Sequence, residues 1–457
     1  MRRVGTALAI PALSLALTAA GPPRRDPPHS GDLPAAPVAP VANEASAAFN
    51  SHSSNTPTEA PAGFDGGSNG FAEEFCAGQD GLVSSPNSPK IPADECNFEA
   101  AEEEFTGPES VADGLGPIFN ATGCGECHSS NMGFDPDFFE KRLVGGTSEI
   151  TEKRAGSWDG RTFRDHPGGS LIHNRSLRSY EQERVLPGNT VIALRSTLSV
   201  FGDGFVEAIA NETLQAIAAR QPSAQRGQII NVPVLEKPGT TRVGRFGHKD
   251  QQASLVSFSA DAYVNEMGIT SPLQPDEPTF NGAAVEDPVP GVDDEGVDVE
   301  LFALFMRSTK APPVDEALAA TDDARAGRQI FEQVECAVCH TPTIVTAPPG
   351  SRINGGALKV ANALGNKIIH PFSDFLLHDV GTGDGIVQNG GQSTRNKMRT
   401  AALWGLRARG RLMHDQLSFS VEDAIQRHGN QGATARSKFN DLRSSDKRRL
   451  LAFLSSL

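Results

Sequence analysis

Two short stretches of this chain hold residues that could do redox chemistry. Residues 124–128 read Cys-Gly-Glu-Cys-His, and residues 336–340 read Cys-Ala-Val-Cys-His. Two thiols at this spacing, followed directly by an imidazole, form the attachment pattern of c-type haem, in which the sulfurs hold the porphyrin and the histidine ligates iron. The sequence therefore predicts two covalently bound haem c groups. The predicted binding residues are Cys124, Cys127, His128, Cys336, Cys339 and His340, with His128 and His340 as metal ligands.

Other uses of a cysteine pair explain these stretches less well. A dithiol redox pair or half of a zinc site would leave the histidine after each pair without a role. The chain has two more cysteines, Cys76 and Cys96. They either close a loop as a disulfide in an oxidising compartment or stay as free thiols, because the sequence does not show how far apart they lie.

The elements that must position these residues are predicted to be mainly helices. Apolar residues recur with helical spacing over 205–219 and 252–263, and the second segment ends at Gly268. Glu266 is therefore expected near a helix end. The polar, Gly- and Arg-rich stretch 129–189 is predicted to form loops. The predicted fold class is mostly α-helical and loop-rich.

A further helix is predicted from Ser420, which can cap it with its side chain. Val421, Ala424 and His428 recur at helical spacing, so His428 is expected on an apolar helix face. Upstream of this helix, residues 398–405 resemble residues 194–202 with one residue fewer, which indicates a duplicated haem domain.

The chain is expected to be exported and to have two haem domains. Residues 1–20 have a basic start, an apolar centre and a small-residue end, as in a secretory signal peptide, and residues 21–70 have the composition of a disordered linker. An N-terminal domain, 71–310, and a C-terminal domain, 311–457, are predicted to bind one haem each. No later segment is long and apolar enough to predict a membrane span.

The formal net charge of −15 argues against nucleic acid as a partner, because a surface that binds phosphate would be basic. The acidic residues gather in two runs, 99–104 and 286–300. These runs are expected to be solvated surface, a docking face for a basic electron donor, or a calcium site.

The chain resembles the di-haem oxidoreductases, a family related to the bacterial di-haem cytochrome c peroxidases. The resemblance covers about residues 110–457 and is carried by an ordered set of segments. These segments are residues 114–128, 244–249, 265–270, 336–340, 372–381 and 398–429. The resemblance implies an enzyme in the periplasm.

In the related peroxidases the N-terminal haem is the peroxide site, and a glutamate in a segment like Asn265-Glu266-Met267 assists cleavage of the O–O bond. The resemblance therefore implies that Glu266 is catalytic. A carboxylate could take a proton from one peroxide oxygen and deliver it to the other, so that water leaves. The alternative is an acid that satisfies backbone groups at a helix end.

In those enzymes the C-terminal haem relays electrons and often has a methionine as its sixth ligand, after a His-Asp-Gly segment. Here His414-Asp415-Gln416 is followed 14 residues later by His428. The resemblance thus implies His428 as the second metal ligand of this haem, with His378 and His414 as rivals. An imidazole should lower the potential of the haem relative to a methionine.

The sixth ligand of the first haem stays open among His166, His173, His248 and a vacant position. The predicted function is reduction of hydrogen peroxide at the N-terminal haem, with electrons from a small c-type cytochrome or a cupredoxin relayed through the C-terminal haem. Two alternatives remain. One is a di-haem electron-transfer cytochrome without a substrate site, and the other is a di-haem oxidase of an organic, protein or thiol substrate.

Overall fold

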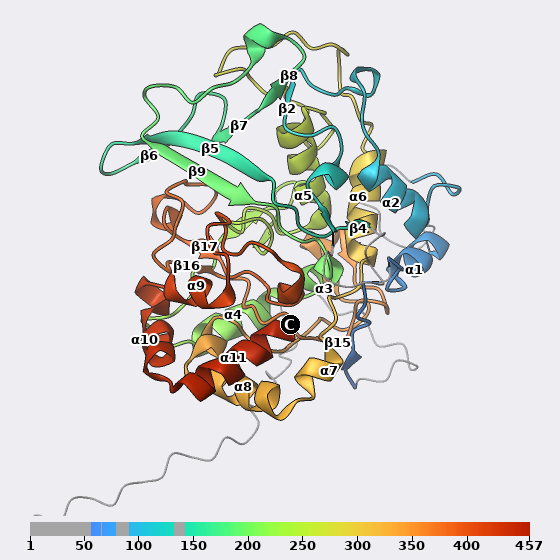
Figure 1. The fold of residues 1–457 in the computed structure, drawn as a ribbon. Helices are drawn as coiled ribbons and strands as arrows, with labels where there is room; N and C mark the ends of the chain where they lie inside the picture. Colours follow the sequence, from blue (N-terminus) through green and yellow to red (C-terminus); the bar gives the residue numbers. More distant parts are fainter. Residues whose placement is uncertain (1–55, 65, 79–90, 132–141) are drawn as a thin grey trace, which may run out of the picture. The chain divides into compact units, whose positions relative to one another are not determined.

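The computed structural model describes residues 56–64, 66–78, 91–131 and 142–457 (Figure 1). All of these residues belong to one compact unit of the chain. The predicted signal peptide and the predicted linker up to residue 55 lie outside the described residues.

The first described residues belong to a small sheet. Strand β1 (Thr58–Glu59) pairs in parallel with β15 (Lys367–Ile369), which pairs antiparallel with β12 (Ile344–Val345). Phe64, a few residues later, is buried. The described part of 56–70, which we predicted as linker, is therefore ordered. The prediction was wrong here because a Pro- and Ala-rich composition does not prevent a short segment from adding to a sheet edge.

Cys76 and Cys96 form a disulfide, with their Cα atoms 5.6 Å apart. Cys76 lies in helix α1 (Phe71–Ala77), and Cys96 lies just before helix α2 (Phe98–Thr106). Both helices pack against helix α6 (Val297–Ser308). Of the two alternatives for these cysteines, the structure contains the bonded one.

A four-stranded antiparallel sheet occupies much of the stretch that we predicted as loops. Strand β5 (Thr151–Trp158) pairs with β9 (Val191–Ser196) over six residues along one edge, and with β6 (Phe163–Asp165) and β7 (Leu171–Ile172) along the other (Figure 1). Helices hold 33% of the residues and strands hold 15%. The fold is therefore mixed and loop-rich rather than mostly α-helical.

The remaining strands are short and form two-stranded pairs. They are β2 (Ile118–Phe119) with β8 (Arg175–Ser176), β3 (Ser129–Asn131) with β4 (Arg142–Val144), β10 (Asn231–Pro233) with β11 (Thr241–Val243), β13 (Arg352–Ile353) with β14 (Leu358–Lys359), and β16 (Leu377–His378) with β17 (Met398–Arg399).

Two helical segments predicted from periodicity differ in detail from the prediction. The segment 205–219 consists of two helices, α3 (Asp203–Glu207) and α4 (Asn211–Arg220). Helix α5 (Leu255–Ala262) begins at the capping residue Ser254 and continues into a π-helical turn, Tyr263–Met267.

Gly268 ends this π-helical turn with a φ of 76°. A Cβ atom at Gly268 would lie 2.7 Å from the carbonyl oxygen of Gly116, so only glycine fits both the dihedral angle and the space. The turn is therefore held directly against the segment that leads into residues 124–128.

The C-terminal helices form a second layer of packing. Helix α8 (Asp322–Gln333) packs along α11 (Ser444–Ser455), and the shorter helices are α7 (Glu316–Ala319), α9 (Val421–Gln426) and α10 (Ala433–Asp441). Ser420 caps α9 as predicted, by accepting a hydrogen bond from the backbone N–H of Asp423. The helix ends at Gln426, and His428 lies beyond that end. The prediction that His428 lies on an apolar face of this helix was therefore wrong.

The larger apolar core joins residues from both sides of position 310, with Phe305 and Trp404 among them. A second cluster of buried residues, which includes Phe331, Phe439 and Phe453, lies between the C-terminal helices. The boundary between two haem domains near residue 311 stays a prediction. Within the described parts of the chain, no helix is both long enough and apolar enough for a membrane crossing.

Candidate functional site

The second cysteine motif begins directly after α8. Cys336–Val338 form a 3-10 turn, and the backbone N–H of His340 donates to the carbonyl of Cys336 over 3.0 Å. The Nδ1 atom of His340 lies 2.9 Å from the carbonyl oxygen of Phe372, to which it donates. A histidine held in this way presents its other nitrogen, Nε2, to a metal.

The ring of His428 lies opposite that of His340, with 6.4 Å between the two ring centres. The Nδ1 atom of His428 donates to the carbonyl oxygen of Ala424 over 2.7 Å, so the free nitrogen is again Nε2. Metal–imidazole bonds are about 2 Å long, so two imidazoles on one iron hold their ring centres roughly 6 Å apart. The spacing fits a haem iron between the two rings.

Both imidazoles are in the protonation state that ligation needs. Burial lowers the pKa of His340 to about 4, and the neighbouring His428 adds to this effect. Burial likewise lowers the pKa of His428. Both rings are therefore neutral at pH 7, with a lone pair available for iron.

A cavity of about 1120 Å³ contains this site. Its volume is slightly above the range of roughly 300–1,000 Å³ that is usual for ligand pockets. Cys336, Cys339, His340 and His428 line it, and so do several arginines, including Arg399, Arg409 and Arg436. Thiols, paired imidazoles and cationic groups for the propionates are the donor set that a haem c requires. The cavity also reaches Ser129 and Leu198, close to the first motif.

The thiols of both motifs have raised pKa values. Burial raises the pKa of Cys336 and of Cys127 to about 12, and that of Cys124 and Cys339 further. A reactive dithiol or a zinc ligand needs a thiolate, which a lowered pKa provides. The four thiols are therefore neutral in the folded chain at pH 7.

The first motif is built in the same way. Cys124–Glu126 form a 3-10 turn, and the backbone N–H of His128 donates to the carbonyl of Cys124 over 2.9 Å. Phe105 packs edge-on against the His128 ring, with the ring centres 5.9 Å apart. Burial lowers the pKa of His128, so this ring is also neutral.

Glu266 lies close to the first motif. Its negative charge raises the pKa of both Cys124 and Cys127, and its carbonyl oxygen accepts a hydrogen bond of 2.6 Å from the backbone N–H of Asn120. The π-helical turn therefore brings this carboxyl group to the predicted haem-binding residues.

Glu266 shares a hydrogen bond with a second carboxyl group, that of Glu152 in β5. Burial raises the pKa of Glu266 well above its usual value, and the charge of Glu152 raises it further. Burial would also raise the pKa of Glu152, but the Arg154 guanidinium, 2.9 Å away, outweighs this and lowers it to about 2. The two pKa values are shifted in opposite directions, so Glu266 is the member of the pair that keeps its proton to the higher pH.

Two of the three candidates for the sixth ligand of the first haem have both ring nitrogens in hydrogen bonds. His166 bonds to Asn189 at 2.9 Å and to Asn281 at 2.7 Å. His173 bonds to Glu183 and to the carbonyl of Asn265, both at 2.7 Å. The third, His248, donates to the carbonyl of Ser196 and lines the cavity.

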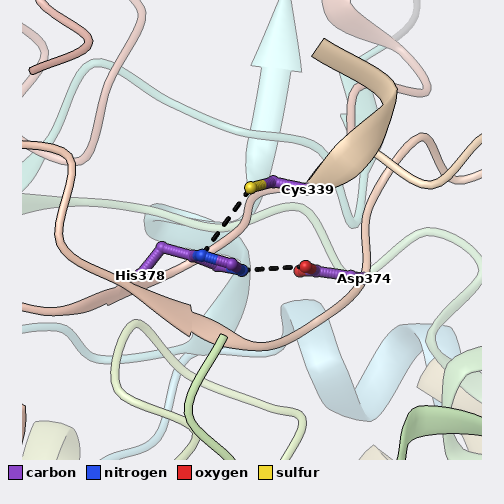
Figure 2. Close-up of side chains that lie close together, drawn as sticks. All are labelled: Cys339, Asp374 and His378. Carbon is purple, nitrogen blue, oxygen red and sulfur yellow. Dashed lines mark hydrogen bonds and ion pairs between the residues drawn. The ribbon is translucent and has the colours of Figure 1, made fainter. Parts of the chain in front are cut away.

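The rivals of His428 are held by other groups. His414 bonds to the carbonyl of Thr382, and His378 lies between two side chains, as Figure 2 shows. Its Nε2 is 2.8 Å from Asp374 Oδ2, and its Nδ1 is 3.6 Å from Cys339 Sγ. Both nitrogens of His378 are used, so this ring supports the thiol of Cys339.

The two acidic runs meet in space. The carboxyl oxygens of Glu104, from the first run, and Asp298, from the second, lie with those of Glu109 within 4.8 Å of one another. The two runs therefore contribute to one cluster of carboxyl groups. A calcium site in these runs stays a prediction from the sequence.

Glu152, Arg154 and Asp374 were not found from the sequence. Glu152 and Arg154 are two residues apart on one strand and so share a face of the sheet. The charged residues at alternate positions 152 and 154, within the polar stretch 129–189, were the signal that could have indicated a strand with both side chains on one face. Asp374 is buried and lies four residues before His378, but this spacing has no meaning outside a helix.

A family model described as "Di-haem oxidoreductase, putative peroxidase" matches residues 174–457. A comparison with curated proteins found no match.

Three solved structures are similar to this chain. Hydrazine synthase from Kuenenia stuttgartiensis is 14% identical, with 90% of this chain and 100% of that chain covered and a TM-score of 0.36. A MauG-like protein associated with microbial copper homeostasis is 15% identical, with 81% and 92% covered and a TM-score of 0.37. The diheme peroxidase BthA from Burkholderia thailandensis is 14% identical, with 77% and 86% covered and a TM-score of 0.27. At these TM-scores only the family match is used below.

Proposed function

The chain belongs to the di-haem oxidoreductases, a family of enzymes, and from this membership we propose that it reduces hydrogen peroxide at a haem on His128. Electrons reach this haem through a second one, between His340 and His428. Membership of the family implies two haems, and the paired cysteines at 124/127 and 336/339 are consistent with covalent attachment of both. Bound haem supplies the redox chemistry, and the chain controls access and protons.

The observation that carries this proposal is the hydrogen-bonded pair of Glu152 and Glu266, two buried carboxyl groups whose pKa values are shifted in opposite directions. Reduction of peroxide needs a base that takes a proton from one oxygen and an acid that gives a proton to the oxygen that leaves. Glu152 is ionised and can accept, whereas Glu266 is protonated and can donate. A pair of carboxyl groups with separated pKa values is suited to both tasks at one pH. Glu266 is the catalytic residue in this scheme.

The test compares the holoprotein with its Glu266→Gln variant, which keeps the shape of the side chain but loses the proton. We expect peroxide turnover to fall by roughly 100- to 10,000-fold. Electron paramagnetic resonance (EPR) spectra of the ferric protein should show a signal that peroxide consumes in the wild type and leaves in the variant. The matched control is Glu286→Gln, the same change at a side chain that is 76% exposed, with turnover within twofold of wild type.

Three outcomes separate the functions. Loss of turnover in Glu266→Gln alone supports the peroxidase. Two ferric signals that ignore peroxide in every redox state would contradict it and leave an electron carrier. Consumption of peroxide only when an organic, protein or thiol compound is added would identify an oxidase of that compound.

We propose that His428 is the sixth ligand of the second haem. The opposed rings of His340 and His428 support this, and so do the hydrogen bonds that occupy both nitrogens of His378. Replacement of a histidine ligand by methionine raises the potential of a haem. In His428→Met we therefore expect the potential of one haem to rise by on the order of 0.1 V or more in a spectroscopic redox titration. An unchanged potential would contradict the assignment.

The electron donor that we propose is a small c-type cytochrome or a cupredoxin in the periplasm. The proposal of export rests on residues 1–20, whose sequence pattern is that of a signal peptide. The negative net charge of −15 favours a basic donor, because opposite charges speed the encounter of two proteins.

A further inference from the structure

We propose that Tyr263 is a redox-active residue that gives one electron to the haem on His128 and so stores an oxidising equivalent of peroxide in the protein. This proposal rests on the proposed function, since hydrogen peroxide is the oxidant. Tyr263 begins the π-helical turn that carries Glu266. Such turns are rare and are often found at functional sites.

The phenol of Tyr263 is buried and aimed at carboxyl groups. Tyr263 is 2% exposed, and its hydroxyl donates a hydrogen bond of 2.8 Å to Oε1 of Glu109. The hydroxyl is also 3.4 Å from Oδ2 of Asp298. A phenol gives up an electron most readily when its proton can leave at the same time, and this bond supplies the acceptor.

Aromatic rings connect the phenol with the haem ligand. The ring centre of Tyr263 is 5.0 Å from that of Phe302, which is 6.3 Å from Phe105. Phe105 is in turn 5.9 Å from the ring of His128. The four rings form a continuous path through the core, and the two phenylalanine rings between the phenol and the imidazole hold no ionisable proton.

The surroundings of Glu109 favour acceptance of a proton. Burial raises the pKa of Glu109, and burial together with neighbouring carboxylates raises those of Glu104 and Asp298 to about 7. These three groups lie within 4.8 Å of one another, so a proton that reaches Glu109 reduces their mutual repulsion. The acidic cluster thereby favours a neutral, oxidised Tyr263 beside a protonated Glu109.

Reduction of one hydrogen peroxide to two waters takes two electrons and two protons, and solvent supplies both protons. Tyr263 provides one of these electrons through Phe302 and Phe105. A haem held by His128 would supply the other, and a second electron from the external donor would restore it. The O–H bond of Tyr263 breaks, and its proton forms a bond to Oε1 of Glu109. One electron from the external donor and the same proton later restore the phenol.

The chain offers a matched control, because it has only two tyrosines. Tyr180 is 70% exposed, whereas Tyr263 is 2% exposed. Tyr263→Phe and Tyr180→Phe each remove a single hydroxyl group. Equal ferric EPR and visible spectra of the two variants will show that both fold and hold their haems.

The experiment mixes the ferric holoprotein with hydrogen peroxide in the absence of a reductant and freezes the sample for EPR. We expect an organic radical signal that narrows when the protein is made with ring-deuterated tyrosine. The signal should fall at least tenfold in Tyr263→Phe and persist in Tyr180→Phe. In Glu109→Gln, which lacks the proton acceptor, it should fall several-fold.

Other results would overturn the proposal. An equal radical signal in Tyr263→Phe would do so, as would its absence from the wild type while peroxide consumes the ferric signals. In both cases the peroxidase function would stand. Ferric signals that do not respond to peroxide would instead overturn the proposed function, and the role of Tyr263 with it.

Discussion

Glu152 controls the proton on Glu266. Its negative charge and its hydrogen bond both raise the pKa of Glu266, so the folded protein keeps this acid protonated at a pH where a free glutamate would be ionised. Activity that needs the proton is present below the raised pKa and is lost as the pH rises through it. The high-pH limit of activity is therefore a property of the pair.

The Glu152→Gln variant tests this relationship. The variant removes the proposed proton acceptor, so we expect turnover to fall at every pH. Without the charge of Glu152 the pKa of Glu266 also falls, so the loss of the remaining turnover should begin at a pH lower by about one unit or more. The pH profile of kcat/KM between pH 5 and 9 measures it, with Glu286→Gln as the unshifted control. A profile with its high-pH limit in the wild-type position would contradict the link between the two carboxyl groups.

Single residues could be predicted from the sequence where their role follows from their immediate neighbours in the chain. The six haem-binding residues form two patterns of five consecutive positions, so no knowledge of the fold was needed to name them. Their assignment to haem c stays a prediction, as do the roles of Glu266 and His428, which came from the family resemblance. Glu152 could not be named because its partner, Glu266, is distant in sequence and only the folded chain brings the two together.

At the scale of elements, helices with a regular apolar period were predicted more accurately than strands. The helix around 252–263 was found, but periodicity did not reveal that its last turn is π-helical, since one widened turn hardly changes the pattern of buried positions. Strand β5 was missed because it is polar. Its residues are held by pairing along both edges, and this leaves no apolar alternation in the sequence.

Helices α2 and α6 bring the two acidic runs together. Because the carboxyl groups of these runs are close and partly buried, the free energy of folding depends on pH. Burial and nearby carboxylates raise the pKa of Glu104 from 4.5 to about 7. The folded state thus binds this proton more tightly than the unfolded state does. The stabilisation by the proton is complete below pH 4.5 and is lost as the pH rises to about 7.

Glu104→Gln should therefore stabilise the protein at pH 8, by roughly 1–2 kcal/mol after allowance for solvent screening, and have little effect at pH 4. Urea unfolding of the holoprotein at both pH values measures the difference. Equal effects at pH 4 and pH 8 would contradict the raised pKa.

At the scale of the whole molecule, buried charges join the N-terminal and C-terminal parts. Asp384 accepts a hydrogen bond of 2.8 Å from Nε of Arg195 and forms an ion pair with Lys249 at 2.8 Å. None of the three side chains is more than 1% exposed. Arg195 belongs to the segment 194–202 that resembles 398–405. The two segments meet in space, since a Cβ atom on Gly202 would lie 2.9 Å from the Trp404 ring.

These contacts explain why the domain organisation was hard to predict. The sequence shows the similarity of the two segments and the repeated haem motif, and both suggest two separate units. An ion pair between positions 195 and 384 leaves no local signal in either half. The core that crosses position 310 is likewise invisible in a pattern of neighbouring residues.

Strand β1 also determines when the fold can close. Thr58 pairs with Lys367, 309 positions later, so a chain that emerges from its N-terminus cannot complete this sheet until most of its length is present. Both cysteine motifs emerge before residue 367 does. Their thiols are thus accessible to covalent chemistry while the chain is still open, and they become enclosed only afterwards. We therefore expect that covalent attachment of a cofactor can precede the pairing of β1 with β15.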